Sequence, residues 1–302
     1  MKIQLLLVVL LLTASCSSDN RAVFNGEINS ASDRSGAAVA TALTSRYQDT
    51  RPNCGADSKP AFLCSGIDLR GTAEATTAFD AWNPSPTAVR VGGVSFSYLR
   101  SDYKMRRLAF DYTHGFIFYP VLSKPAGKIT VKVLCFFPID GQSDNRPEAG
   151  CGASANRPKS DRCHRVGVTT GEQWAKHYND YGEHSAGGIG GCSMDVRDSA
   201  NQYAGSNFYE GLRGGRLISP KTFEKPNDLK HETWAQNIPA TLPIEAFFYT
   251  TPAGLASSRY DQKRFHTLTG IAIPIISVKL PSTLAADATF TFLPADQVVQ
   301  IQ

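Results

Sequence analysis

The cysteines constrain the fold of this chain more than any other feature of its sequence. Seven are present: Cys16 stands apart near the amino terminus, and the other six fall between residues 54 and 192. An even set of cysteines predicts disulfides in an exported chain, whereas in a reducing compartment the same set would indicate metal binding or catalysis. The role of the cysteines therefore depends on whether the chain is exported.

The amino terminus has the pattern of an export signal. Lys2 precedes an apolar run over residues 3–12, which is much shorter than the roughly 20 residues that a membrane-spanning helix needs. The small residues Thr13-Ala14-Ser15 follow directly before Cys16, in the order of a bacterial lipobox. We therefore predict that Cys16 is lipidated and becomes the amino terminus. A plain secretory signal with a coincidental cysteine is the alternative.

These signals divide the chain into three parts. Residues 1–15 form the predicted signal peptide, and residues 16–37, which are rich in Ser, Asn and Asp, form a lipidated flexible tether. Residues 38–302 form a single globular domain. Ser17, rather than aspartate, follows the cysteine, which in enteric-type sorting indicates the outer membrane. The protein is thus expected to be an outer-membrane lipoprotein or to be secreted.

Export makes the other six cysteines a disulfide framework that staples loops. Six cysteines allow 15 pairings. Two of them, Cys54 and Cys64, flank a short polar loop and are predicted to pair. The entropy of loop closure favours short loops, and so predicts Cys135–Cys151 and Cys163–Cys192. A zinc site is the competing interpretation, but the sequence contains no Cys-x-x-Cys pair.

The composition is that of a globular protein and excludes several classes. Of 302 residues, 42% are hydrophobic and 19% are charged, a balance that excludes wholesale disorder. The net charge is only +4, and the basic run over residues 100–107 is interrupted by Asp102. A nucleic-acid partner is therefore not expected, since nucleic-acid-binding proteins carry a clustered basic surface.

Hydrophobic periodicity predicts an α+β domain with a largely antiparallel, mixed sheet, several helices and disulfide-stapled loops, because no regular βαβ alternation appears. Strands are expected over residues 62–69, 94–99, 116–121, 129–137, 244–249 and 271–280, and helices over 38–47, 76–82, 170–178 and 228–234.

One set of polar residues within these elements points to chemistry. Arg70, followed by Gly71 and Thr72, ends a predicted strand, and Ser95 and Ser97 lie on one face of the next strand, because side chains alternate with a period of two. Glu245 lies within the apolar strand over 244–249. A carboxylate buried in such a strand needs either a function or an ion-pair partner, since burying it alone costs several kcal/mol.

The order strand-arginine, Ser-x-Ser strand, strand-glutamate resembles that of cholera-toxin-type ADP-ribosyltransferases and related NAD glycohydrolases. An arginine fork binds a pyrophosphate, or holds the cleft together, through paired hydrogen bonds. The serines would orient the glutamate, which would accept from the ribose 2′-hydroxyl and stabilise an oxocarbenium-like transition state as nicotinamide departs. Phe96 or Tyr98 would stack on the nicotinamide.

A wider resemblance extends over most of the mature chain. Its stretches are Arg46-Tyr47-Gln48-Asp49-Thr50-Arg51 with Cys54, Pro60-Ala61-Phe62-Leu63-Cys64-Ser65-Gly66, Leu69-Arg70-Gly71-Thr72, Ala81-Trp82-Asn83-Pro84-Ser85-Pro86, Gly93-Val94-Ser95-Phe96-Ser97-Tyr98-Leu99-Arg100, Gly115-Phe116-Ile117-Phe118 and the loop over residues 140–152. These stretches resemble the halovibrin-like secreted proteins.

That resemblance implies an ADP-ribosyltransferase-like core and an enzyme that uses NAD as substrate, with no permanently bound cofactor. It implies that Ser95, Ser97 and Glu245 are catalytic and that Arg70, with Gly71 and Thr72, binds the substrate. Pro243 stands two residues before Glu245, where protein-modifying members have Glu or Gln. Hydrolysis of NAD is therefore favoured over ADP-ribosyl transfer to an acceptor protein, and either Glu232 or Glu224 is the next candidate for the working carboxylate.

Two other functions compete with this one. A non-catalytic surface lipoprotein that binds a glycan, a host component or an envelope partner would carry the same tether and disulfides. A cell-wall hydrolase would need paired carboxylates, for which Asp68, Glu74 and Asp80 are the candidates. No metal site is expected, because His177 and His184 are separated by a stretch that breaks the helix between them.

The export signal leads to a direct test. Cys16→Ser should release the protein from the membrane fraction, because the residue that would carry the lipid is removed. Partitioning of the wild-type and variant proteins in a detergent-phase extraction measures this. A wild-type protein found wholly in the aqueous phase would show that the chain is secreted without a lipid.

Overall fold

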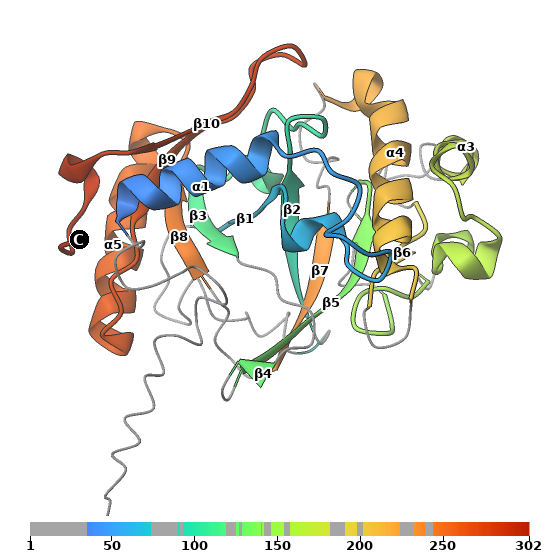
Figure 1. Cartoon of the computed structure of the whole chain (residues 1–302), viewed down its shortest axis with the longest axis horizontal. Helices are drawn as coiled ribbons and strands as arrows, with labels where there is room; N and C mark the ends of the chain where they lie inside the picture. Colours follow the sequence, from blue (N-terminus) through green and yellow to red (C-terminus); the bar gives the residue numbers. More distant parts are fainter. Residues whose placement is uncertain are drawn as a thin grey trace, which may run out of the picture.

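One ten-stranded sheet organises the described part of the chain (Figure 1). The structure is a computed structural model and describes residues 35–73, 90, 93–118, 125–126, 129–139, 141, 146–153, 158–181, 191–197, 202–223, 232–238 and 244–301. The strand order is β10-β9-β8-β3-β1-β2-β7-β5-β4, with β6 beside β5. All neighbours are antiparallel except β8 and β9. The predicted class, α+β with a largely antiparallel sheet, is confirmed.

The strands are β1 (Ile67–Gly71), β2 (Val94–Leu99), β3 (His114–Phe118), β4 (Pro125–Ala126), β5 (Ile129–Phe137), β6 (Met194–Asp195), β7 (Glu232–Ile238), β8 (Ile244–Tyr249), β9 (Ile275–Lys279) and β10 (Thr289–Phe292). The α-helices are α1 (Gly36–Gln48), α3 (Gly171–Tyr181), α4 (Ala204–Thr222) and α5 (Pro252–Thr269). Short 3₁₀ turns are η2 (Ala61–Leu63), η3 (Ala109–Asp111), η5 (Pro158–Ser160), η6 (Cys163–Val166) and η7 (Pro294–Asp296).

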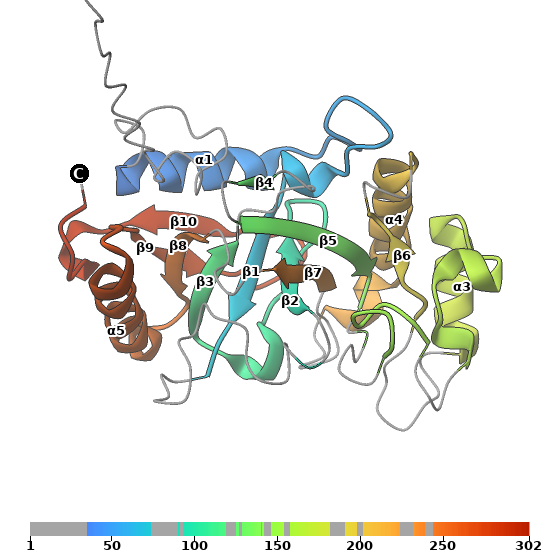
Figure 2. The same cartoon turned by 90° about the horizontal axis from the view of Figure 1, so that it is seen from below.

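The helices flank the sheet in two groups. Figure 2 shows α1 and α5 on opposite sides of strands β8 to β10, and α4 with α3 at the other end of the sheet, beside β5 and β6. Ser35 caps the amino terminus of α1, since its hydroxyl accepts a hydrogen bond from the Ala38 amide at 3.1 Å. Thr251 caps α5 in the same way, and Gly270 ends it with a left-handed φ of 70°. No helix among these described segments is long and apolar enough to cross a bilayer.

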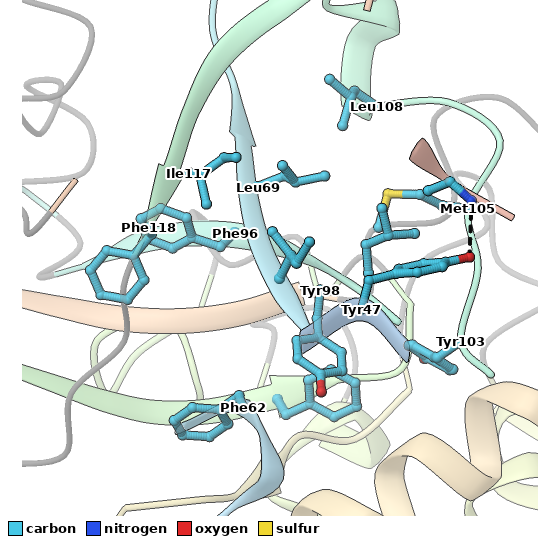
Figure 3. Packing of buried hydrophobic residues seen from close by; sticks show 14 of the residues in the cluster. Tyr47, Phe62, Leu69, Phe96, Tyr98, Tyr103, Met105, Leu108, Ile117 and Phe118 are labelled. Atoms are coloured by element: carbon cyan, nitrogen blue, oxygen red, sulfur yellow. Dashed lines mark hydrogen bonds between the residues drawn. The ribbon is translucent and has the colours of Figure 1, made fainter. Parts of the chain in front are cut away.

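Aromatic side chains fill the centre of the sheet (Figure 3). Phe96 of β2 stacks on Phe118 of β3 with ring centroids 4.3 Å apart, and Tyr98 packs edge-on against Phe208 of α4. The Tyr98 hydroxyl donates to the carbonyl of Ser65 at 3.1 Å, and burial raises its pKa to about 12. Phe96 and Tyr98 of β2 are thus buried in this aromatic core.

The three predicted disulfides are confirmed. Bonds join Cys54 to Cys64, Cys135 to Cys151 and Cys163 to Cys192. The loops beside the second and third bonds are also held by Arg146, whose buried guanidinium donates to the carbonyls of Gly141, Gly152, Ser160 and Gly191 and lies 4.6 Å over the Phe137 ring. One arginine thereby satisfies four backbone acceptors that have no strand or helix to pair with.

Most of the predicted elements are present. The predicted strands over 94–99, 129–137 and 244–249 coincide with β2, β5 and β8, and those over 116–121 and 271–280 overlap β3 and β9. The predicted helices over 38–47 and 170–178 correspond to α1 and α3, although α1 begins two residues earlier, inside the predicted tether. Of the predicted strand over 62–69, only residues 67–69 lie in a strand, β1, because residues 61–63 form η2. The predicted helix over 76–82 lies outside the described residues.

Residues 232–238 correct one prediction. The pattern predicts a helix over 228–234, but this segment forms β7, which pairs with β2 on one side and β5 on the other. Thr233 and Trp234 are residues that favour strands, and pairing on both sides outweighs a short local helical pattern.

Hydrophobic periodicity predicts neither α4 nor α5. Helix α4 carries four glycines, which lower its helical propensity, yet a Cβ atom at Gly215 would lie 2.1 Å from the Tyr103 hydroxyl oxygen. Helix α5 buries polar residues: Ser258 donates to the Phe248 carbonyl and Gln262 to the Ile273 carbonyl, both at 2.7 Å. Both helices are therefore stabilised by contacts with the sheet rather than by an apolar stripe.

Each disulfide should stabilise the fold more when it closes a longer loop. Replacing Cys163 and Cys192 together by alanine opens a loop with a sequence separation of 29 and should lower the free energy of unfolding by about 3.6 kcal/mol. Replacing Cys54 and Cys64, which are separated by 10 residues, should cost about 2.7 kcal/mol. Urea unfolding measures both. Equal stability of wild type and the first variant would contradict the predicted contribution.

Candidate functional site

Arg70 and Ser95 meet at one end of the sheet. β1 ends at Gly71 where β2 begins, and the Arg70 guanidinium (Nη1) donates to the Ser95 carbonyl at 2.7 Å and lies 3.4 Å from the Ser95 hydroxyl. Close packing of β1 and β3 permits this arrangement, because a Cβ atom at Gly115 would lie 1.8 Å from the Arg70 carbonyl oxygen. The predicted arginine and the first serine are therefore adjacent.

Ser97 lies further inside the sheet. It is buried and stands opposite Leu69 of β1 and opposite Glu232 of β7. Side chains alternate along a strand, so the Ser95 and Ser97 side chains share a face while Arg70 starts from the other face. The contact with the Ser95 hydroxyl brings the guanidinium around the strand end towards the serine face.

Glu245 lies elsewhere. Its strand, β8, is separated from β2 by β3 and β1, a distance of about 14 Å at the usual strand spacing. The Glu245 carboxylate accepts a hydrogen bond from the Arg46 guanidinium of α1 at 2.8 Å, and its side chain is 2% exposed. The ion pair accounts for a carboxylate inside an apolar strand. Ser95 and Ser97 therefore do not contact or orient Glu245.

The electrostatics of Glu245 reflect that pair. Burial raises the pKa of the Glu245 carboxyl above its ordinary value of 4.5, and the charge and hydrogen bond of Arg46 lower it again in part. A carboxylate with a raised pKa occurs both in catalytic sites and in structural ion pairs. Here the arginine comes from a helix packed on the sheet, which indicates that the pair fastens α1.

The structure corrects the prediction for the two aromatic residues of β2. Phe96 and Tyr98 were expected to stack on nicotinamide, but both lie in the hydrophobic core and are 1% and 0% exposed. The rings of Phe118, Phe116 and Phe208 occupy their faces and edges. A ligand ring has no access to them, because side chains at these positions point towards neighbouring aromatic strands and α4.

Gly71 and Thr72 continue the strand end. The Thr72 amide donates to the His114 carbonyl at 3.0 Å, and a Cβ atom at Gly71 would lie 2.8 Å from Cβ of Tyr112. These contacts place both residues beside β3, and a contact of either with substrate stays a prediction.

The pairing register of β2 and β7 identifies a further candidate carboxylate, Glu232. The predicted helix over 228–234 would have placed this residue outside the sheet. As the first residue of β7, it pairs with Ser97 across the β2–β7 ladder. Residues directly opposite each other in an antiparallel pair have Cβ atoms about 5 Å apart. The β-favouring pair Thr233-Trp234 is the sequence signal that points to a strand here.

The other candidate polar residues are either buried in the fold or lie outside the described residues. Asp68 is fully buried in β1 opposite Tyr98 and Phe118, where no polysaccharide reaches it, and Glu74 and Asp80 lie outside the described residues. His177 is buried on α3, with Nε2 at 2.6 Å from the Lys159 carbonyl oxygen; His184 lies outside the described residues. Within the part of the chain described, no group of three or more His, Cys, Asp or Glu is placed to hold a metal ion.

Comparisons with known proteins add no assignment: no family profile, curated protein or solved structure matches this chain.

The Arg46–Glu245 pair leads to a pH-dependent prediction. Arg46→Met leaves the Glu245 carboxylate buried without this cation and should lower the free energy of unfolding at pH 7 by about 3 kcal/mol. The folded pKa of Glu245 is raised, so the native state binds a proton more readily than the unfolded state. Its favourable contribution is complete below the unfolded pKa and is lost as pH rises through the folded pKa.

The deficit of Arg46→Met should therefore shrink as pH falls towards 4.5, the ordinary value of this carboxyl, where protonation neutralises Glu245. Urea unfolding at a series of pH values measures it. The double variant Arg46→Met/Glu245→Met is the control, because it leaves neither charge and should lose this pH dependence. A deficit independent of pH would show that Arg46 stabilises the fold through packing alone.

Proposed function

We propose that this protein is an exported enzyme that hydrolyses NAD at the bond between nicotinamide and ribose, on an ADP-ribosyltransferase-like core. The observation that carries the proposal is the contact of Arg70 with Ser95 across two adjoining strands. Ser97 follows on the same strand, and Glu232 holds the position opposite it. In this proposal Arg70, the Ser-x-Ser pair and Glu232, on the neighbouring strands β1, β2 and β7, take the three roles of the pattern.

Each residue type suits one part of the substrate. A guanidinium binds a pyrophosphate through several N–H donors at fixed geometry, and the Ser95 carbonyl orients that of Arg70. A carboxylate at the β7 position would accept from the ribose 2′-hydroxyl and stabilise the positive charge that develops at the anomeric carbon. Ser97, on the strand between, would orient that carboxylate by a hydrogen bond.

The reaction balances with water alone. The bond between the anomeric carbon and the nicotinamide nitrogen breaks, and nicotinamide leaves with the bonding electron pair. Water adds to the anomeric carbon and loses a proton to solvent, which gives ADP-ribose. Hydrolysis requires no acceptor protein.

Glu232 takes the place of Glu245 in this proposal. Glu245 has a structural partner in Arg46 and lies on a strand separated from that of the serines by two others. Glu232 is paired with Ser97 across the β2–β7 ladder. A serine can orient a carboxylate only when the two residues are neighbours in this way.

The test is release of nicotinamide from NAD by the mature protein. Glu232→Gln should lower kcat by about 10²–10³ while NAD still binds, because an amide keeps the shape without the charge. Glu245→Gln is the matched control and should leave kcat within about threefold of wild type. Arg70→Lys should instead raise KM, since an ammonium does not reproduce the fork of a guanidinium.

The outcomes show which of the two carboxylates, Glu232 or Glu245, is catalytic. Loss of kcat in Glu245→Gln, with full activity in Glu232→Gln, would return the catalytic role to Glu245. Absence of nicotinamide release by the wild-type protein would overturn the proposed enzymatic function. The alternative, a non-catalytic lipoprotein that binds a ligand or partner, would then take its place.

A further inference from the structure

The turn before β3 presents an aromatic side chain to solvent. Phe110, in η3, is 64% exposed, more than any other large hydrophobic residue recorded for the described segments. Its neighbour Leu108 is buried and anchors the turn in the core. A phenylalanine ring normally gains by burial, so its position outside the core calls for a separate explanation.

The backbone at this turn is strained. Phe110 has φ 55° and ψ 22°, and Asp111 has φ 53°. This left-handed region is unfavourable for a side chain with a Cβ atom, and phenylalanine gains nothing there from a local polar bond. Two backbone hydrogen bonds hold the turn, from Asp111 N to the Leu108 carbonyl and from Tyr112 N to the Ala109 carbonyl, both at 3.2 Å. Strain that the fold maintains at an exposed residue marks a functional candidate.

The turn lies beside Arg70. The Phe110 and Tyr112 rings are tilted with centroids 5.6 Å apart, and Tyr112 packs against Gly71, the residue that follows Arg70. The chain then enters β3, which pairs with β1. Phe110 is thus held on the β3 side of Arg70, whereas the serines and the position of Glu232 lie on its β2 and β7 side.

The order of these residues across the sheet matches the order of the parts along a dinucleotide. Strands β7, β2, β1 and β3 are consecutive neighbours and span about 14 Å at the usual spacing. In the proposed function, the nicotinamide ribose lies at β7 and β2 and the pyrophosphate lies at Arg70. The adenine end then extends towards β3, where the Phe110 side chain is exposed.

We propose that Phe110 stacks on the adenine of NAD and makes the enzyme prefer the dinucleotide over the mononucleotide. The proposal rests on the proposed function and adds its specificity residue. Stacking of a base on an aromatic side chain is sequence-tolerant and strong enough to change affinity about tenfold.

Kinetics of NAD and nicotinamide mononucleotide cleavage by the mature protein test this. Phe110→Gly removes the ring and suits the positive φ, so its melting temperature should equal or exceed that of wild type. Its KM for NAD should rise about tenfold with kcat unchanged, and its KM for the mononucleotide, which lacks adenine, should not change. Phe110→Trp should keep the low KM for NAD. Tyr203→Ala, which removes another exposed ring at the start of α4, is the matched control and should leave both values unchanged.

The failures are distinguishable. An active wild-type enzyme whose KM for NAD is unchanged in Phe110→Gly would overturn the adenine site alone. Equal rises in KM for both substrates would also overturn it, because the ring would then contact the nicotinamide half. A wild-type protein that cleaves neither substrate would overturn both proposals together.

Discussion

The ladder between β2 and β7 joins the two halves of the sheet. On one side of it lie β1, β3, β8, β9 and β10, and on the other lie β5, β4 and β6. Its register pairs residues 94–97 with 232–235, which are far apart in sequence, so the ladder forms only after a long loop closes. The aromatic core around Phe96 and Tyr98 and the alignment of Glu232 with Ser97 both depend on it.

Buried charges are used in this fold to hold peripheral segments onto that sheet. Arg46 fastens α1 through Glu245, and Arg100 is held by both oxygens of Asp102, which also accepts from Arg216 of α4. Arg146 instead pairs with backbone carbonyls of the disulfide-bonded loops. A buried charge is tolerated only when it has an ion-pair or hydrogen-bond partner, so each of these residues specifies which segment packs against which.

The proposed site differs from these clusters in its position. It lies at the end of β1 and the start of β2, where Arg70 is oriented by a carbonyl and a serine and where the strained turn at Phe110 adjoins Gly71. Strand ends leave the ladder, so in the proposed site their polar groups and loops would bind substrate while the strands behind them fix their positions. The aromatic interior supplies that rigidity, which is why Phe96 and Tyr98 belong to the support of the site and not to its surface.

Local patterns in the sequence determined the disulfide pairs, the α+β class and the strands β2, β5 and β8, because short loops favour closure and alternation reports a strand wherever a face is buried. The sequence also predicted Arg70 at a strand end and Ser95 and Ser97 on one face of the next strand. Only the tertiary structure decided that Arg46 pairs with Glu245, since the two are 199 residues apart and no local pattern links them. It also decided that residues 232–238 form a strand, that a glycine-rich segment forms α4, and that Glu232 rather than Glu245 stands beside the serines. In each of these cases the deciding energy comes from packing and ladder bonds between distant segments, which outweigh the weak preferences of a short stretch of chain.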